Sequence, residues 1–567
     1  MLSFYDFEVF KHDWLVVLIN PIERTIRKIH NDKTDLEEFY KKHKEQIWIG
    51  YNSRNYDQYI LKSILLQMNP KEVSDWIIKK GRKGWEYSSL FNQLQLFNYD
   101  CSNRFNSLKQ LEGFMGNNIK ETGVPFDIDR PLTLEEIERT FEYCQHDVEQ
   151  TMEVFNRTKN EFDAQMSLLK TFNLPLQMIG KTQAQLASII LDAHRKDLLD
   201  EWDIRLPETL SLKKYKAVGD WFTDKANHDY EKTFSTEIAG VKHIVAWGGL
   251  HGAIDKYSYT CSEDELLVMA DVDQLYPTLM ILYNLLSRAV SDPEKFKQIL
   301  AKSLELKRLK KKKEREPYKR ICNITYGAEG DQFNAMYDPL HRNLVCVFGQ
   351  VLMIDLIEKI ERFCKLIQSN TDGILVLIKR KDFDKLDDAV YAWEQRTGLH
   401  MSFDYFKRII QKDVNNYIAI DFEGQAKTKG AFVKKLSDLD YDMPIVNKAV
   451  SQYIISGTQI EQTILECDEL REFQKIVKLS AKYESAWHNG KELTDKTFRV
   501  FADKRSTSDR LCKCRGSKDK WSMAKFGNTP DQAYIWNESV VSVKCPQWLD
   551  KQYYIDIAKK RLELFGL

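Results

Sequence analysis

The apolar run Leu266–Ala270 and the acids that follow it constrain the fold of this chain more than any other feature. The run has the composition of a buried strand, is followed by Asp271 and Asp273, and ends at Tyr276-Pro277. Alternate residues of a strand face the same side, so both carboxylates can face one cleft. Buried charge without a partner is costly, which favours a bound cation at the end of this strand. A strand end with solvated acids is the alternative.

A further acid lies in a predicted hairpin downstream. Residues 366–378 are apolar on both flanks and polar in the middle, where Asp372 is followed by Gly373. The segment between the two acidic sites carries polar side chains at near-helical spacing, namely Lys319, Asn323 and Tyr326. Residues 301–320 hold ten Lys or Arg against three Glu. Carboxylates that hold metal ions beside a cationic helix are the groups that phosphoryl transfer with a bound triphosphate requires.

The three segments read DxxxLYP, KxxxNxxYG and TD, and in this order they resemble motifs A, B and C of the family B DNA polymerases. The resemblance implies a right-hand polymerase of palm, fingers and thumb that acts on primer-template DNA and dNTPs. It implies two divalent ions, Mg²⁺ or Mn²⁺, with ligands from Asp271, the backbone carbonyl of Val272, and Asp372. The nucleotide-binding residues that it implies are Tyr276, Arg308, Lys312, Lys319, Asn323, Tyr326 and Gly327, with Lys319 also catalytic. Tyr276 is expected to exclude a 2′-hydroxyl and so to select deoxynucleotides.

Two features depart from the family pattern. The hairpin of motif C usually reads DTD, and here it reads Asn370-Thr371-Asp372, so only the second acid is carried over. The gaps between the motifs are also short, with 48 positions from Asp271 to Lys319 and 45 from Gly327 to Asp372. Protein-primed phage polymerases carry long insertions in both gaps. The resemblance is therefore to a compact phage-type enzyme that extends a nucleic-acid primer.

Acids near the N-terminus form a second candidate metal site. Asp6 and Glu8 lie on one face of a predicted strand, residues 3–9. A third acid, Asp57, follows another apolar strand and ends a segment that begins at Asn52.

A predicted helix supplies the fourth acid of this site. Thr133 and Glu136 form a capping box at its start, and Tyr143 and Asp147 lie one turn apart on one face. The order DxE, NxxxYD, YxxxD resembles the three motifs of the 3′–5′ proofreading exonucleases on an RNase H-like fold. The resemblance implies two divalent ions, a role for Tyr143 in orienting water, and as metal ligands Asp6, Glu8, Asp57 and Asp147. Acids that cap helices and pair with lysines are the alternative.

Several further residues are expected to contact DNA. Asn52 is expected to hold the terminal nucleotide. The segment Ser107–Leu111 resembles a short motif that contacts single-stranded DNA, with Ser107 and Leu108 as the expected contacts, although Ser107 can equally cap a helix. The family carries a YxGG-type template-binding loop where this chain has Ala246 in place of the tyrosine, followed by Trp247, Gly248 and Gly249. Candidates for the primer-holding element are Lys412 and Tyr417.

The predicted fold is mixed α/β and α+β, with an RNase H-like exonuclease followed by a right-hand polymerase. The predicted domains are an exonuclease 1–165, a helical connection 166–240, palm 241–295, fingers 296–345, palm 346–428 and a thumb 429–567. Within the thumb, residues 496–525 hold ten basic residues against three acidic ones, interleaved with polar residues and Trp521. This composition is typical of a loop that follows a phosphate backbone, or of a disordered surface loop.

Composition bounds the remaining expectations. The formal net charge is zero, but nucleic-acid binding depends on where charge lies rather than on its total. No apolar segment approaches the roughly 20 residues that span a bilayer, and no signal peptide is recognised. Ten cysteines contain no CxxC pair, which favours reduced thiols in a cytoplasm, that of the host if the chain is phage-encoded. We expect a monomer, with replication accessory proteins as candidate partners.

The leading hypothesis is a DNA polymerase with proofreading that replicates a phage or mobile-element genome from a nucleic-acid primer. Asn370 and Ala246 motivate an alternative, an exonuclease whose polymerase palm is degenerate. A protein-primed or primer-independent polymerase is a further alternative, and the short gaps between motifs disfavour protein priming.

Overall fold

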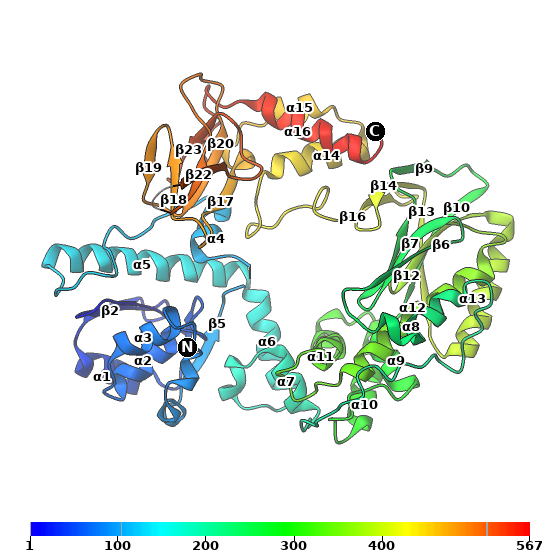
Figure 1. Cartoon of the computed structure of the whole chain (residues 1–567), viewed down its shortest axis with the longest axis horizontal. Coiled ribbons are helices and arrows are strands. Elements are labelled where there is room, and N and C mark those ends of the chain that lie inside the picture. The colour runs from blue at the N-terminus through cyan, green and yellow to red at the C-terminus, as the bar shows by residue number, and fades with distance from the viewer. Residues whose placement is uncertain (1, 104, 518–519) are drawn as a thin grey trace. The chain divides into compact units, whose positions relative to one another are not determined.

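The computed structural model describes residues 2–103, 105–517 and 520–567, and the chain forms two compact units (Figure 1). Unit 1 comprises residues 1–180, 435–446 and 461–556, and unit 2 comprises residues 181–434, 447–460 and 557–567. The range predicted as thumb is therefore divided between the two units. The basic stretch predicted within it includes residues 518–519 and the side chain of Trp521, which lie outside the described part of the chain.

The N-terminal part of unit 1 is built on a five-stranded mixed sheet, in the order β3-β2-β1-β4-β5. Its strands are β1 (Leu2–Val9), β2 (Trp14–Asn20), β3 (Thr25–His30), β4 (Ile47–Gly50) and β5 (Phe97–Asp100). The central strand β1 runs antiparallel to β2 and parallel to β4. The helices of this part are α1 (Lys33–His43), α2 (Asp57–Leu65), α3 (Pro70–Ile78), α4 (Leu108–Met115), α5 (Leu134–Arg157) and α6 (Lys159–Thr171). Helix α5 covers one face of the sheet, and α1 to α3 lie on the other (Figure 1).

The predicted capping box of α5 is confirmed. Thr133 is the N-cap, its backbone N–H donates to Glu136, and the backbone N–H of Glu136 donates to its hydroxyl. The cap fixes where the helix begins and therefore which of its residues face the sheet. The face that carries Cys144, Asp147 and Val148 is buried against the sheet.

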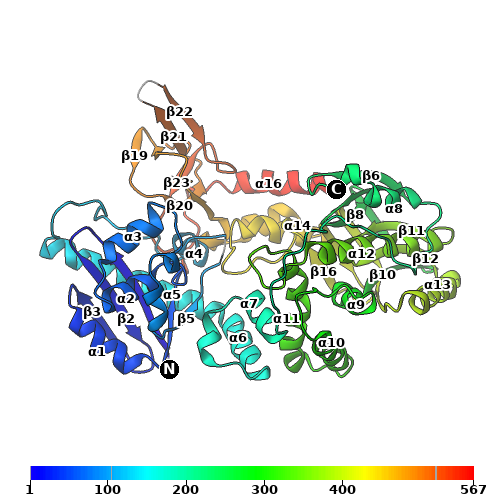
Figure 2. The same cartoon turned by 60° about the horizontal axis from the view of Figure 1, so that its bottom comes forward.

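The C-terminal part of unit 1 contains a β region, and its strands are grouped in one place in both ribbon views (Figures 1 and 2). One sheet consists of β17 (Lys475–Lys478), β20 (Thr497–Ala502) and β23 (Ala533–Ile535). The other has the order β19-β18-β21-β22, with β18 (Ser485–His488), β19 (Lys491–Leu493), β21 (Cys512–Ser517) and β22 (Lys520–Lys525). A shared core that includes Val477, Phe498 and Phe526 joins them.

Unit 2 is built on a seven-stranded antiparallel sheet, in the order β13-β10-β12-β11-β8-β7-β6. Its strands are β6 (Thr233–Ile238), β7 (Val241–Ala246), β8 (Gly249–Ala253), β10 (Glu265–Val272), β11 (Lys365–Ser369), β12 (Gly373–Lys379) and β13 (Met401–Phe406). A four-stranded sheet contains β9 (Tyr257–Thr260), β14 (Arg408–Asp413), β15 (Asn416–Ile420) and β16 (Ala426–Lys429).

The helices of unit 2 are α7 (Gln183–Ile190), α8 (Lys216–Thr223), α9 (Leu275–Leu282), α10 (Pro293–Arg308), α11 (Lys312–Glu329), α12 (Pro339–Ile360) and α13 (Phe383–Thr397). Helix α12 is apolar on nearly all sides and is buried along almost its whole length, as expected for a central core helix. Three helices contain residues of both units: α14 (Pro444–Ser456), α15 (Ile460–Glu466) and α16 (Lys551–Leu564).

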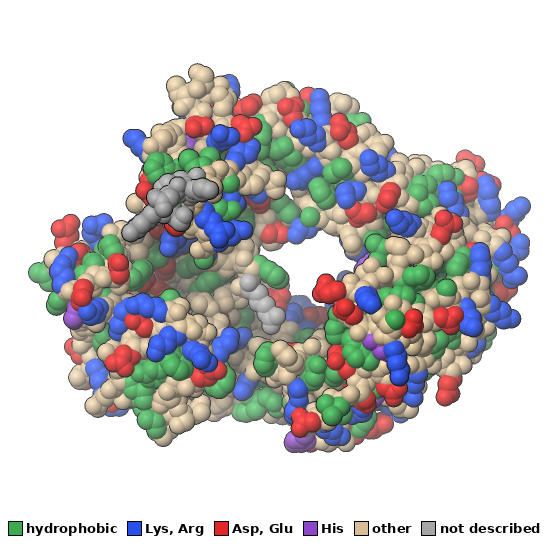
Figure 3. All heavy atoms as spheres, in the orientation of Figure 1, with side chains coloured by type: hydrophobic (Ala, Val, Ile, Leu, Met, Phe, Trp, Pro, Cys, Tyr) green, Lys and Arg blue, Asp and Glu red, His purple; other side chains and the backbone are tan. Residues whose placement is uncertain are grey.

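The structure also bears on the cysteines, on membrane-spanning helices and on the distribution of charge. All ten cysteines are free thiols. Within the described part of the chain, none of the helices combines the length and the apolar composition that crossing a membrane would need. Basic and acidic side chains are intermixed over the face seen in Figure 3, in keeping with a net charge of zero.

Candidate functional sites

Asp271 and Asp372 meet at one end of the seven-stranded sheet. Strand β10 pairs with β12, which places Asp271 opposite Gly373. The backbone N–H of Val272 donates to the carbonyl of Asp372 at 2.8 Å, so the turn between β11 and β12 is fastened to the end of β10. A Cβ atom on Gly373 would lie 2.0 Å from Oδ1 of Asp271. Only glycine leaves room for the Asp271 carboxylate beside this turn.

A pocket of about 410 Å³ opens beside these acids. Its lining residues are Val272, Gln274, Leu275, Tyr276, Pro277, Asn323, Thr371 and Asp372. The pocket therefore combines the start of α9, one side chain of α11, and the turn that carries the downstream acid. The ring of Tyr276 packs against that of Tyr326, with their centroids 4.1 Å apart. Residues of all three predicted polymerase motifs thus lie around one cavity.

The electrostatics at this site fit a divalent cation. Burial raises the pKa of Asp271, and the negative charges of Asp372 and Asp404 act in the same direction. The positive charges of Lys427 and Lys429 oppose that effect without cancelling it. Carboxylate and carbonyl oxygens are the donors that Mg²⁺ and Mn²⁺ prefer, and such an ion would relieve the repulsion between the two aspartates.

Asp273, the second acid of the strand end, has partners of its own. Its carboxylate pairs with Lys307 of α10 and accepts a hydrogen bond of 2.6 Å from the Ser402 hydroxyl. The hydrogen bonds from these two side chains lower its pKa, whereas that of Asp271 is raised. This contrast favours Asp271 over Asp273 as the cation ligand.

Helix α11 carries the other residues predicted from the polymerase motifs. Lys319, Asn323 and Gly327 are exposed, and Tyr326 is half-buried. Two further predicted nucleotide-binding residues are Arg308, the last residue of α10, and Lys312, the first residue of α11. They lie on either side of the turn between the two helices.

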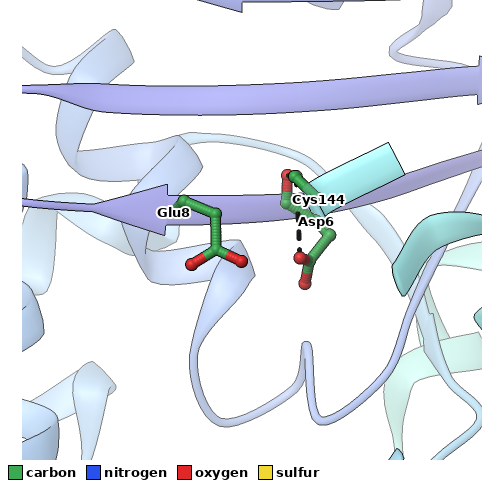
Figure 4. A group of neighbouring side chains, drawn as sticks. All are labelled: Asp6, Glu8 and Cys144. Carbon is green, nitrogen blue, oxygen red and sulfur yellow. Dashed lines mark hydrogen bonds between the residues drawn. The ribbon is translucent and has the colours of Figure 1, made fainter. Parts of the chain in front are cut away.

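In unit 1, Asp6 and Glu8 face the same side of β1, together with Cys144 of α5 (Figure 4). One side-chain ligand atom from each residue lies within 4.8 Å of the others. The Cys144 thiol donates to the Asp6 carbonyl at 3.3 Å and approaches its carboxylate at 3.7 Å. Burial raises the pKa of Cys144, so the sulfur stays protonated and serves Asp6 as a donor. The two carboxylates are the metal-binding groups of this trio, because Mg²⁺ prefers oxygen.

Asp57 and Asp147 approach this pair from two helices. Asp57 is the first residue of α2, and its carboxylate accepts a 3.1 Å hydrogen bond from the backbone N–H of Phe7 on β1. Asp147 lies on α5, where Lys109 of α4 pairs with it and with Glu112, the latter at 3.0 Å.

All four predicted carboxylates have raised pKa values. Burial raises those of Asp6 and Glu8 well above their usual range, and the other acids of the site add to the effect. Burial raises the pKa of Asp57 to about 7 and that of Asp147 to about 6, the latter against the opposing charge of Lys109. Four mutually repelling oxygen ligands fit divalent cations.

Sequence reasoning missed Lys109, Glu112, Cys144 and His146. Glu112, His146 and Asp147 form a second close group of potential ligand atoms. Lys109 also lies 4.6 Å above the ring of Tyr143. Its position within the Ser107–Leu111 segment was a usable signal, because a cation beside predicted acids is a candidate partner.

The predicted DNA contacts in unit 1 differ in accessibility. Asn52 is exposed and adopts a left-handed conformation with φ +61°, and its backbone N–H donates to Asp100 at 2.9 Å. Ser107 is the N-cap of α4, where its backbone N–H and hydroxyl donate to the side chain of Gln110. Leu108 is buried. These two placements favour the helix-cap interpretation of that segment.

The prediction that Trp247 contacts DNA does not fit its environment. Its side chain is 1% exposed, and its ring packs 4.9 Å from that of Trp202 and 5.2 Å from that of Phe222. Its indole N–H donates to the carbonyl of Asn227 at 3.0 Å. Trp247 is therefore a core residue, because its ring is buried and its polar group has a partner inside unit 2.

Trp247 and Gly248 form the turn between β7 and β8, and Gly249 is the first residue of β8. Gly248 has open space around it, whereas a Cβ atom on Gly249 would lie 2.4 Å from Oγ1 of Thr371. Gly249 also has a φ of +148°, which side-chain-bearing residues rarely adopt. The turn is thus packed closely against the turn that carries Asp372.

The candidate primer-holding residues lie on neighbouring strands. Lys412 of β14 pairs with Asp413. Tyr417 of β15 is buried, and burial raises its pKa to about 12, with Asp271 and Asp372 adding to the shift. Tyr417 therefore lies within electrostatic range of both predicted palm ligands.

Likeness to known proteins is found among solved structures. No protein-family model and no curated protein sequence matches the chain. Among solved structures, the family B DNA polymerase from the hyperthermophilic archaeon Pyrobaculum calidifontis is similar with a TM-score of 0.42 and 14% identity. The alignment covers 100% of this chain and 77% of that polymerase. The likeness concerns the overall architecture and assigns no residue.

Proposed function

We propose that the chain is a DNA-directed DNA polymerase with a 3′–5′ exonuclease that proofreads its product. The observation that carries the proposal is the meeting of Asp271 and Asp372 beside a pocket to which α11 contributes Asn323. A second set of four carboxylates in unit 1, with Asp6 and Glu8 on the central strand of its sheet, supports the exonuclease.

In the polymerase reaction, divalent ions held by Asp271, Asp372 and the carbonyl of Val272 would supply Lewis acidity at the primer 3′-hydroxyl and the α-phosphate. The chain's own residues position the nucleotide. Lys319, on the exposed face of α11, supplies positive charge for the triphosphate. Tyr276, held against Tyr326, limits the space at the 2′-position of the sugar.

In the exonuclease reaction, ions at Asp6, Glu8, Asp57 and Asp147 would supply the Lewis acidity for phosphodiester hydrolysis. The Phe7 backbone N–H holds Asp57 toward β1, and Lys109 holds Asp147. Tyr143 is proposed to orient the attacking water, and the exposed Asn52 to hold the terminal nucleotide.

Primer extension with Mg²⁺ and four dNTPs tests the proposal. Asp271→Asn or Asp372→Asn should abolish extension and leave degradation of single-stranded DNA intact, whereas Asp6→Ala with Glu8→Ala should do the reverse. Asp264→Asn is the matched control, because this exposed acid lies just before β10 and pairs with Lys379. Normal extension by Asp372→Asn would refute the metal assignment.

The same assay separates the alternatives. Wild-type protein that degrades DNA but never extends a primed template would be an exonuclease with a degenerate palm. Synthesis on an unprimed template would favour primer-independent initiation. We infer priming by a nucleic-acid strand, which predicts synthesis only when an annealed primer is present.

A further inference from the structure

Three aromatic side chains and two cations form one surface on the β region of unit 1. We name it the aromatic patch, and its members are Lys504, Arg505, Tyr534, Trp536 and Trp548. The ring of Tyr534 lies 4.4 Å from that of Trp548 and 6.0 Å from that of Trp536. All three rings are partly exposed, and both cations are exposed.

Backbone hydrogen bonds hold the patch in place. The N–H of Lys504 donates to the carbonyl of Trp548 at 3.0 Å, and that of Trp536 donates to the carbonyl of Arg499 at 2.9 Å. Tyr534 lies on β23, paired with Phe501 of β20. A binding surface fixed in this way loses little conformational entropy when a ligand is bound.

Arg505 is oriented across the rings by a neighbouring acid. Its guanidinium lies 5.1 Å from the centroid of Tyr534 and 5.4 Å from that of Trp548. Nε and Nη2 of Arg505 donate to Asp503, and within the described part of the chain Nη1 has no partner. The indole nitrogen of Trp536 is buried and likewise has no partner among the described residues. The patch therefore offers one free donor to a ligand, Nη1 of the exposed Arg505, beside aromatic faces.

We propose that the aromatic patch binds single-stranded DNA. Bases stack on exposed aromatic rings, and arginine both stacks and contacts phosphate, which is how proteins hold single strands without sequence preference. The charge is complementary to phosphate, because Lys504 and Arg505 of the patch are both exposed cations. Duplex DNA does not fit equally well, since its bases are already stacked on one another and present no free faces.

A simpler explanation for three clustered rings is that they are partly exposed side chains at the edge of the hydrophobic core and bind no ligand. Rings that only cover the core would not require the buried Asp503 to hold the Arg505 guanidinium across their faces. The proposal adds a nucleic-acid surface to the two carboxylate sites and does not depend on the activity of either.

Fluorescence anisotropy with labelled oligo(dT) of about 16 nucleotides tests the proposal, a length within the range that one binding module covers. The full chain carries Asp6→Ala and Glu8→Ala, and EDTA is present, so the probe is not degraded. Trp548→Leu should weaken binding about tenfold, the loss of one stacked base, and Trp548→Phe should restore most of it. A thermal unfolding curve for each variant shows whether it is folded.

Lys504→Glu tests the charge without removing a packed ring, and Lys482→Glu is its matched control. Lys482 is exposed in the same β region and undergoes the same change of charge. We expect Lys504→Glu to weaken binding several-fold more than the control does. Equal effects of the two substitutions, together with unchanged binding by Trp548→Leu, would overturn the proposal.

Photocrosslinking of the unmutated patch provides an independent readout. Oligonucleotides with 5-bromodeoxyuridine should crosslink to Tyr534, Trp536 or Trp548, as located by peptide mass spectrometry. Crosslinks found only in other parts of the chain would contradict the inference. Neither measurement uses dNTPs, so failure of primer extension and failure of this proposal remain distinguishable.

Discussion

Lys109 is the residue that balances the acids of unit 1 when no metal is bound. Its side chain is 12% exposed, and it pairs with Asp147 and with the fully buried Glu112. Burial disfavours the charge of Lys109, but Asp147 and Glu112 overcome that penalty and raise its pKa above the ordinary value. The lysine thus supplies part of the positive charge that a divalent ion would otherwise bring.

Replacing Lys109 with Met should destabilise the metal-free protein strongly. Removing one partner of a buried ion pair leaves the other charge without compensation, at a cost of about 3 kcal/mol. Urea unfolding in EDTA measures the loss, and Mg²⁺ should recover more stability in the variant than in the wild type. Lys79→Met is the control, because its pair with Asp75 is exposed and contributes at most about 1 kcal/mol. Similar losses in both variants would contradict this role.

At the residue scale, sequence patterns could predict the acids but not their partners. Asp6, Glu8 and Asp147 follow from strand and helix periodicity, because neighbours on one face are only two or four positions apart. Cys144 lies on α5, as Asp147 does, but its contact with Asp6 of β1 depends on how that helix packs on the sheet. The burial of Trp247 could not be predicted either, because Trp202, whose ring packs against it, is distant in sequence.

At the element scale, the turn between β7 and β8 positions the turn that carries Asp372. Gly249→Ala should push the two turns apart, because the new methyl group would overlap Thr371 and φ +148° would be strained. We expect primer extension to fall about tenfold or more, consistent with a strain of about 1–3 kcal/mol, and exonuclease activity to stay unchanged. Gly248→Ala, where the space is open, is the matched control. Full activity of Gly249→Ala would show that the contact does not matter.

Helix boundaries were predictable only where the sequence marks them. The sequence of residues 296–345 predicts a pair of helices, and the pair is confirmed as α10 and α11. No Gly or Pro marks the break between them, which falls at Lys310 with φ +55°. The amphipathic pattern of residues 181–199 predicts one helix, and the structure shows that this prediction is wrong. Helix α7 ends at Ile190, because Asp192 leaves the helical conformation at φ +51° and Ala193 bridges to Val290. Such long-range bridges leave no local signal.

At the scale of the whole molecule, unit 1 is assembled from segments far apart in the sequence. The N-terminal region, which contains α4, packs against the β region near the C-terminus, where Gly113 contacts Ile476. The backbone N–H of Ile119 donates to the carbonyl of Asn537 at 2.7 Å. Domain boundaries predicted from the sequence order assign these segments to different domains, because a linear division cannot detect contacts across more than 300 positions.

Arg499 is the residue through which this long-range assembly can be tested. Its fully buried guanidinium donates to the carbonyls of Gly113 and Asn117 on one side and of Trp536 and Glu538 on the other. Burial lowers the pKa of Arg499 to about 9, so the side chain remains charged at pH 7. Its hydrogen bonds therefore offset the free-energy cost of burying that charge.

Arg499→Met should remove these bonds while keeping a long apolar side chain. Each carbonyl left buried without a donor costs about 1–3 kcal/mol, so unit 1 should lose several kcal/mol of stability. Because all of these contacts lie within unit 1, exonuclease activity should be lost on heating at a lower temperature than primer extension. The exposed Arg510→Met provides the control for loss of charge alone. Parallel loss of both activities in Arg499→Met would mean that the two units unfold together rather than separately.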